Sequence, residues 1–531
     1  MLPKEFKSRM TAILGDQANK LFDELENAEA VKSFRVNGVK NDAHAFEKAC
    51  ATIDRDDSLW MENAYYTKEK YPGSLPEHHA GAIYMQDPSA MATVTALDCL
   101  DGLTVLDCCA APGGKTGQLS AAVGPQGVVF ANEYEAARSK ILYSNVERLG
   151  CKNVIITNVD TSTYREEYRD CFDVVVCDAP CSGEGMFRKN GRAIEEWSVE
   201  NVNMCAERQR EILANVVGCV KAGGRLLYST CTFSLEENEM NVAWLLDNYP
   251  EFELCDVTNE LKAATSDGVN IDGCSYDMTK TRRCYPHISK GEGQYIALLK
   301  RKMNDEDLAQ NASNLTTADD LPDCKNQECI VKKQRKKGKN AIENNKKCNN
   351  QLQNKQQVEL IGLGKRFLTD NLTEVPDGEF VVLGDKLWLS PVTDLPRCEL
   401  IAAGVCLGEA QKGRFVPHHQ LFSAFGGLFV RRLCLAYSSP LAAAYLFGEE
   451  LSLERASVIR TDRNEDFARE NASFDSDACV CAYADAYYAS AGNLNGWAAV
   501  ILGGCAVGAV KVSGTVAKNH YPKGLRNKRI G

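Results

Sequence analysis

The sequence VLDCCAAPGGKTGQLS, residues 105–120, predicts an apolar strand, a turn of small residues and a helix. Ligand-binding crevices of α/β sheets lie at the carboxyl ends of strands, and glycines there let a ligand approach the backbone closely. The turn lacks the G-x-G-x-x-G pattern. It also fails the G-x-x-x-x-G-K-[ST] spacing of a phosphate loop, because the residue five before Gly114 is Cys109. A ligand site other than a nucleotide phosphate loop is therefore expected here.

Around this stretch, short apolar runs alternate with longer amphipathic segments from Gly102 onward. The runs are LTVLDCC, GVVFANE, NVIITNVD, DVVVCDAP, GRLLYSTC and QYIALLKR. Strands that alternate with helices predict a doubly wound parallel sheet. The last run, residues 294–301, follows an irregular segment without a crossover helix, so we expect it to be an antiparallel edge strand.

Composition places the chain among ordinary globular proteins. Its 531 residues suggest about three or four domains, and 44% are apolar. No stretch approaches the ~20 apolar residues of a membrane span, and the N-terminus lacks the apolar region of a signal peptide, so we expect a cytoplasmic protein with no membrane partner. Its 23 cysteines would then be reduced, and because no C-x-x-C pair occurs, no metal is expected. The net charge of -11 argues against a uniformly basic surface but leaves room for local basic patches.

Four parts are expected along the chain. Residues 1–95 mix helical spacing with turn signals and predict a small N-terminal domain, and residues 96–302 carry the alternating pattern. Residues 303–357 are rich in Asn, Asp, Gln and Lys and predict a linker. Residues 358–531 predict a further folded region of mixed α and β character. The linker holds a basic run that is either a solvated tether or a non-specific RNA contact: Lys332, Lys333, Arg335, Lys336, Lys337 and Lys339.

An acidic residue ends each of three expected strands: Glu133, Asp160 and Asp178. A carboxylate at the tip of the second strand can accept both hydroxyls of a ribose. Each residue taken singly is more typical of a helix cap or a loop charge. Three of them after one glycine-rich turn favour an adenosyl ligand without a pyrophosphate, hence S-adenosylmethionine rather than NAD.

Two cysteines follow apolar runs that would end at the same rim of the sheet, Cys181 in DAPCSGEGMFRK and Cys231 in STCTFSLEENE. The C5 carbon of cytosine is too poor a nucleophile to take a methyl group, but addition of a thiolate at C6 makes C5 enamine-like. The adduct must then lose the C5 proton and the thiol, and a second polar group could assist. Most cysteines are buried hydrophobes, yet the flanking Pro180, Ser182, Thr230 and Thr232 indicate loops. A helix after Cys231 would lower its pKa.

These motifs resemble the Sun-domain family of RNA cytosine-C5 methyltransferases. DCCAAPGGKT is similar to the family's first cofactor motif, DAPCSGEGMFRK to its Pro-Cys motif and STCTFSLEENE to its Thr-Cys motif; the match includes FRVNGVK, YMQDPSA and GEGQYIALLKR and covers roughly residues 1–302. The resemblance implies that Cys231 attacks C6, that Cys181 promotes product release and that Asp178 lies between cofactor and base. DNA cytosine methyltransferases use the Pro-Cys cysteine instead, so the Thr-Cys motif favours RNA. The implied contacts to S-adenosylmethionine are Cys109, Ala110, Ala111, Pro112, Gly113, Gly114, Lys115, Glu133, Asp160 and Asp178.

The C-terminus resembles one subgroup of that family. KVSGTVAKNHYPKGLR, residues 511–526, is similar to the closing segment of bacterial 16S ribosomal RNA methyltransferases of the F type, which carry a PUA-like RNA-binding module. The implied fold is α/β: a Rossmann-like class I methyltransferase domain with a small N-terminal domain and a C-terminal PUA-like α+β region. This segment is either an ordinary solvated terminus or a basic RNA-binding patch that carries an aromatic ring. The residues of the patch would be Lys518, Tyr521, Lys523, Arg526, Lys528 and Arg529.

The expected function is S-adenosylmethionine-dependent formation of 5-methylcytosine in ribosomal RNA, with a monomeric enzyme favoured. Transfer RNA as the substrate, a non-catalytic ribosome-assembly factor and a metabolite methyltransferase are the alternatives. Four residues outside the motifs have two interpretations each. His78 and His79 are expected to cap or pack rather than catalyse, and Arg35 and Asn37 either touch RNA or are structural. Residues 86–89 predict the start of a helix.

Overall fold

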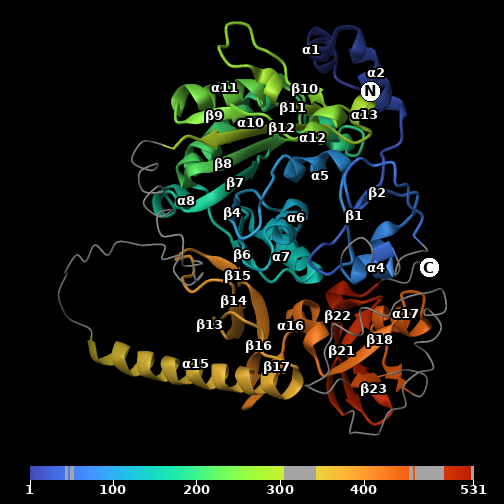
Figure 1. Ribbon diagram of the computed structural model, residues 1–531, viewed down its shortest axis with the longest axis vertical. Helices are drawn as coiled ribbons and strands as arrows, with labels where there is room; N and C mark the ends of the chain where they lie inside the picture. Colours follow the sequence, from blue (N-terminus) through green and yellow to red (C-terminus); the bar gives the residue numbers. More distant parts are fainter. Residues whose placement is uncertain (42–45, 48–52, 304–342, 454–457, 461–494, 528–531) are drawn as a thin grey trace, which may run out of the picture.

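A ten-stranded mixed sheet forms the centre of the computed structural model, which describes residues 1–41, 46–47, 53–303, 343–453, 458–460 and 495–527 (Figure 1). Its strand order is β10-β11-β12-β8-β7-β4-β5-β6-β15, and β9 also pairs with β12. The chain runs from β4 outward to β6 and then returns to the other side of β4, so the order reverses there. The five parallel strands are β4 (Thr104–Asp107), β5 (Val128–Asn132), β6 (Val154–Thr157), β7 (Phe172–Asp178) and β8 (Val220–Thr230).

Every apolar run of the sequence pattern is a strand of this sheet. The last, β12 (Gln294–Arg301), is antiparallel to β8 as expected. It is not an edge strand, because β11 (Arg282–Cys284) and β9 (Phe252–Cys255) both pair with its other side, and β10 (Ser266–Asp267) pairs with β11. These short strands belong to the segment that looked irregular in the sequence.

At the opposite edge, a strand from far along the chain completes the sheet. β15 (Leu400–Ala403) pairs antiparallel with β6, with Ala403 opposite Ile155. The sheet therefore includes residues beyond the expected 96–302 region. Ala402 and Ala403 are fully buried in the same core as Val154 and Ile156.

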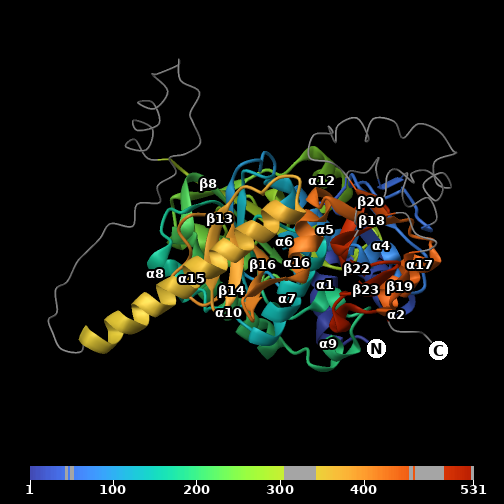
Figure 2. The same ribbon diagram turned by 90° about the horizontal axis from the view of Figure 1, so that it is seen from below.

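Helices cover both faces of the sheet (Figures 1 and 2). One buried cluster includes Leu119, Leu142 and Val146, and the cluster on the other face includes Leu213, Leu245 and Leu246. The helices of this region are α6 (Gly114–Ala122), α7 (Ala136–Leu149), α8 (Ser162–Glu167), α9 (Gly191–Glu195), α10 (Val199–Val216), α11 (Glu239–Asn248), α12 (Asn259–Ala264) and α13 (Pro286–Ser289).

The N-terminal part is a helical pair followed by a three-stranded antiparallel sheet. Phe6 of the first helix is buried against Phe187 and Phe233, which lie within the two cysteine motifs, and against Trp197. The predicted helix start is confirmed, because the Asp87 side chain accepts a hydrogen bond from the Ser89 backbone and Pro88 begins the helix. The elements are α1 (Lys4–Leu14), α2 (Ala18–Asn27), β1 (Ser33–Val36), β2 (Ala64–Tyr66), α4 (Pro76–His79), β3 (Ile83–Met85) and α5 (Pro88–Thr95).

The C-terminal region holds two further sheets. α15 (Glu343–Asn371) crosses the four-stranded sheet, as Figures 1 and 2 show, and begins inside the stretch 303–357 expected to be a linker. The basic run lies outside the described residues. The four-stranded sheet contains β13 (Glu379–Leu383), β14 (Lys386–Ser390), β16 (Val405–Gln411) and β17 (Arg414–Pro417). The second sheet has six strands: β18 (Arg431–Leu435), β19 (Leu451–Ser452), β20 (Val458–Arg460), β21 (Gly496–Leu502), β22 (Cys505–Ser513) and β23 (Val516–Asn519). Helix α16 (His419–Phe425) precedes this sheet, and α17 (Pro440–Phe447) lies between β18 and β19 in the sequence.

Lys40 joins the three parts of the chain. Its ammonium lies within hydrogen-bond distance of the backbone oxygens of Ala80, Arg148 and Ala506 and of the Ser423 hydroxyl, at 2.7 to 3.1 Å. These partners come from the N-terminal part, α7 and the C-terminal region. No helix in the described part of the chain combines the length and apolar character that crossing a membrane requires.

Candidate active site

The glycine-rich turn lies at the point where the strand order reverses. It connects β4 to α6, and Gly113 at the N-cap has φ 106°, which favours glycine. A Cβ on Gly114 would lie 3.0 Å from the Tyr84 ring. Asp107 at the end of β4 is fully buried and accepts a hydrogen bond from Thr116 Oγ1 at 2.7 Å. Burial raises the pKa of Asp107 to about 7.

Asp178, at the end of β7, connects this turn to the neighbouring strands. Its Oδ2 pairs with Lys115 Nζ at 2.8 Å, and its Oδ1 accepts hydrogen bonds from Ser229 Oγ at 2.7 Å and Gln294 Nε2 at 3.1 Å. Burial lowers the pKa of Lys115, but the charge of Asp178 and the bond to it outweigh burial and raise the pKa overall. One carboxylate thus receives donors from α6, β8 and β12, and its side chain is still 30% exposed.

The two cysteines predicted to act together are side by side. Cys181 Sγ and Cys231 Sγ are 3.1 Å apart, and the Cys231 backbone N–H donates to Cys181 Sγ at 3.3 Å. They meet because β7 and β8 are parallel neighbours with Asp178 opposite Ser229, so their following loops leave the sheet together. The hydrogen bond with Cys231 and burial raise the pKa of the Cys181 thiol well above its usual value.

The expected helix after Cys231 is absent from that position. α11 begins only at Glu239, after irregular residues 232–234 and a turn at residues 235–238. The field of a helix terminus falls off within about one turn, so the predicted effect of this helix on the Cys231 thiol is wrong.

The two other acidic residues occupy different environments. Glu133 follows β5 and is 4% exposed; its Oε1 accepts a hydrogen bond from the Glu135 backbone at 3.0 Å and its Oε2 lies 3.6 Å from Arg138 Nη1. Asp160 is exposed and accepts a hydrogen bond from the Ser162 backbone at 2.9 Å, at the start of α8. Of these two residues, Glu133 is the one whose carboxylate is shielded from solvent.

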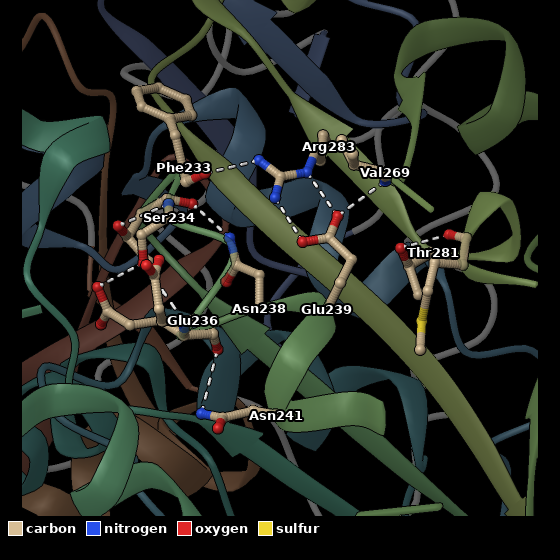
Figure 3. A network of polar contacts seen from close by, with 12 residues as sticks. Phe233, Ser234, Glu236, Asn238, Glu239, Asn241, Val269, Thr281 and Arg283 are labelled. Carbon is tan, nitrogen blue, oxygen red and sulfur yellow. Dashed lines mark hydrogen bonds and ion pairs between the residues drawn. The ribbon is translucent and has the colours of Figure 1, made fainter. Parts of the chain in front are cut away.

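Behind the Cys231 loop lies a buried ion pair that the sequence did not reveal (Figure 3). Arg283 Nε and Nη2 donate to the two carboxylate oxygens of Glu239 at 2.6 and 2.5 Å, and Arg283 Nη1 donates to Phe233 O at 2.8 Å. Both side chains are at most 1% exposed. Asn238 holds the same loop, since its amide donates to Thr232 O at 3.0 Å. The acidic run after Cys231 was visible in the sequence, but its basic partner on β11 was not.

Replacement of Glu239 by alanine is expected to lower the free energy of unfolding by about 3–5 kcal/mol, because Arg283 would remain buried without its partner. Urea denaturation followed by circular dichroism measures this loss. The double variant Glu239→Leu/Arg283→Met, which removes both charges, is the control and should recover most of it. A loss below about 1 kcal/mol in the single variant would contradict the buried pair.

Four residues for which the sequence left two interpretations form contacts within the protein: Arg35, Asn37, His78 and His79. Arg35 is buried, where it donates to Gln86 Oε1 at 3.0 Å and Gly114 O at 2.9 Å, and Asn37 donates to two backbone oxygens. Burial lowers the pKa of His78 to about 3, so this histidine stays neutral. His79 Nδ1 lies 3.4 Å from the hydroxyl of Tyr521.

Tyr521 is therefore not an exposed stacking ring. It is 2% exposed and packs against Tyr445 and His419, between the C-terminal and N-terminal parts, which corrects its expected place in an RNA-binding patch. Lys518 and Lys523 are exposed, and Arg526 is half-buried with its guanidinium donating to Tyr521 O at 3.3 Å. Lys528 and Arg529 lie outside the described residues.

Four family models match successive parts of the chain. The model described as 16S rRNA methyltransferase RsmB/F covers residues 94–300, and that of the N-terminal domain of 16S rRNA methyltransferase RsmF covers residues 2–88. The RsmF first C-terminal domain matches residues 366–425 and the RsmF PUA domain residues 488–527. The chain belongs to the RsmB/F family. Its fold is the class I methyltransferase fold with an N-terminal domain and a C-terminal PUA domain.

Individual members of the RsmB/F family are similar over part of their length. The ribosomal RNA small subunit methyltransferase F of Klebsiella pneumoniae is 35% identical over 249 residues, which is 46% of this chain and 51% of the relative. That of an Enterobacter species is 36% identical over 248 residues, or 46% and 50%. The chain thus spans about half the length of the curated relatives it matches. A solved methyltransferase homologue from Pyrococcus horikoshii is 29% identical with a TM-score of 0.50, covering 56% of this chain and 95% of that one.

The described residues contain no group of three or more His, Cys, Asp and Glu side chains arranged to hold a metal ion.

Proposed function

We propose that this protein methylates C5 of a cytosine in the RNA of the small ribosomal subunit, through a covalent bond between Cys231 and C6 of the base. The observation that carries the proposal is the pair of thiols 3.1 Å apart, next to Asp178 and the glycine-rich turn. A thiolate at C6 and a second group at the adjacent carbon are what C5 methylation requires. The names of the relatives and of the family models support ribosomal RNA as the substrate.

The residues around the turn fit S-adenosylmethionine, which would supply an electrophilic methyl group when bound. Gly113 supplies the left-handed backbone conformation that the turn requires, and the buried Glu133 offers acceptors for ribose hydroxyls. Asp107 Oδ1 is buried and has no hydrogen-bond partner among the described residues, so it is available to a ligand donor. The proposed contacts remain Cys109 to Lys115, Glu133, Asp160 and Asp178.

The arrangement of the two adjacent thiols favours Cys231 as the nucleophile. Because the pKa of Cys181 is raised, Cys181 keeps its proton, and its S–H can donate to the Cys231 sulfur. Formation of the bond to C6 removes that acceptor, which is the largest cause of the raised pKa. The pKa of Cys181 then falls, so its thiol is a better proton donor to the departing Cys231 sulfur, in keeping with a role in release. Asp178 keeps an unused acceptor position on Oδ2 for the cytosine edge.

RNA contact is proposed for the two flanking regions, residues 1–95 and the PUA domain. The exposed Lys511 and Lys518 lie directly opposite each other on β22 and β23, and Lys511 Nζ lies 5.7 Å from the centre of the Trp497 ring. Like charges opposite each other are unfavourable in a sheet, and a phosphate between them would relieve the repulsion.

Labelled S-adenosylmethionine incubated separately with small ribosomal subunits, naked 16S RNA and bulk transfer RNA tests the function, with methylated cytosines mapped by bisulfite sequencing. We expect one discrete site in 16S RNA. Labelling of transfer RNA alone would show that transfer RNA, and not ribosomal RNA, is the substrate. Cofactor binding without methylation of any RNA would favour a non-catalytic assembly factor.

Replacement of Glu133 by alanine is expected to weaken S-adenosylmethionine binding about 10- to 100-fold, the equivalent of about 1.5–3 kcal/mol for hydrogen bonds to a charged group. Isothermal titration calorimetry measures the affinity. Glu135→Ala, which removes an exposed carboxylate two positions away, is the matched control and should bind normally. Equal affinities in both variants would exclude Glu133 from the ribose site.

A further inference from the structure

Two buried carboxylates, Glu184 and Glu237, connect the loops that carry the two cysteines. Glu184 follows Cys181, but its Oε2 accepts hydrogen bonds from Thr232 Oγ1 and the Phe233 backbone, both at 2.9 Å, in the Cys231 loop. Glu237 follows Cys231, but its oxygens accept hydrogen bonds from the Ser182 backbone at 2.9 Å and from the Ser182 hydroxyl, in the Cys181 loop. Each carboxylate therefore binds the residue next to the cysteine of the other loop.

We propose that Glu184 and Glu237 are positioning residues, which together form a crossed carboxylate pair that sets the distance between the Cys181 and Cys231 sulfurs. The proposal rests on the proposed function for its catalytic consequence. The hydroxyls of Ser182 and Thr232 also lie 2.9 Å from each other, and the Gly185 backbone N–H donates to Cys231 O at 2.9 Å. The contacts between the loops thus converge on the positions flanking the sulfurs.

Hydrogen-bond donors surround both carboxylates. Both are buried, and in the described part of the chain neither forms an ion pair with a basic side chain. Burial raises the pKa of Glu184 to about 7 and raises that of Glu237. All their partners are donors: Trp197 Nε1 joins the two donors on Glu184, and Gln209 and Ser234 join Ser182 on Glu237. An acceptor-only group suits this arrangement, whereas the NH₂ of a glutamine would face another donor.

Tight control of the sulfur positions has a chemical reason. The two thiols must act on adjacent carbons of one ring, and reacting atoms need a separation of about 3–3.5 Å before reaction. A displacement of about 1 Å can cost about 100-fold in rate. Two loops that each carry one of the cysteines would not keep this distance between the sulfurs without hydrogen bonds between the loops.

Two serines allow a matched test, because both donate to the same oxygen, Glu237 Oε1. Ser182 donates from the Cys181 loop, whereas Ser234 donates at 3.1 Å from the loop of Glu237 itself. Ser182→Ala removes a bond between loops and Ser234→Ala removes one within a loop. Both should lower the melting temperature similarly. Only Ser182→Ala should lower kcat, by about tenfold or more, with KM for the RNA changed less than about twofold.

A second measurement is independent of RNA. Treatment of the reduced protein with hydrogen peroxide converts two thiols to a disulfide while the peroxide is reduced to two waters, and peptide mass spectrometry measures the rate for the Cys181–Cys231 pair. We expect Ser182→Ala and Thr232→Val to form this disulfide about tenfold more slowly than Ser234→Ala. If wild type methylates no RNA but these rates differ, the positioning role stands and the proposed function fails. If both variants match Ser234→Ala within about twofold in kcat and disulfide rate, the positioning role is overturned.

Discussion

A Cys231→Ala variant is expected to lose at least about 10⁴-fold in kcat, the scale on which enzymes lose activity when their nucleophile is removed. Without the sulfur, no bond to C6 forms and C5 stays too poor a nucleophile to take the methyl group. The substitution leaves the residues proposed to bind the cofactor intact, because the Cys231 sulfur forms a hydrogen bond only with Cys181 among the described residues. S-adenosylmethionine affinity should therefore be unchanged within about twofold. Single-turnover methylation and calorimetry measure the two quantities.

The control for this variant is Cys99→Ala. Cys99 is exposed at the opposite end of the sheet, before β4, and its removal should leave kcat within about twofold. Turnover by Cys231→Ala within about tenfold of wild type would show that another group performs the addition to C6, and the assignment of the nucleophile would be wrong.

Much of the sheet was predictable because each of its central strands contains a short apolar run. The prediction failed where pairing depends on residues far apart in the sequence. β10 and β11 are too short to show a period, so β12 looked like an edge. β15 fills the edge beside β6 with four residues from the C-terminal region, and nothing in their local pattern distinguishes this partner from another.

The meeting of Cys181 and Cys231 was predictable for a different reason. Their motifs follow strands of one parallel sheet, and carboxyl ends of such strands share an edge. The groups that hold the thiols were not predictable, since the crossing of Glu184 and Glu237 depends on how two loops fold. Tyr521 shows the converse error: an aromatic ring among basic residues suggests stacking on a base, but here it is buried between domains.

A Cys181→Ala variant is expected to accumulate a covalent complex with its RNA and to lose about 100-fold or more in multiple turnover. Cys231 can still attack C6, and the methyl group can still be transferred to C5. Loss of the C5 proton and of the Cys231 sulfur should then slow, because the thiol 3.1 Å from that sulfur is missing. A denaturing gel with labelled RNA shows the complex as a band that migrates with the protein.

The adduct also distinguishes the two cysteines from each other. The double variant Cys181→Ala/Cys231→Ala should form no complex, which shows that the bond in the single variant is to Cys231. If Cys181 were the nucleophile, as the Pro-Cys cysteine is in DNA methyltransferases, the pattern would be reversed: Cys231→Ala would trap RNA and Cys181→Ala would not. The raised pKa of Cys181 argues against that reversal, because a thiol that keeps its proton is a poor nucleophile.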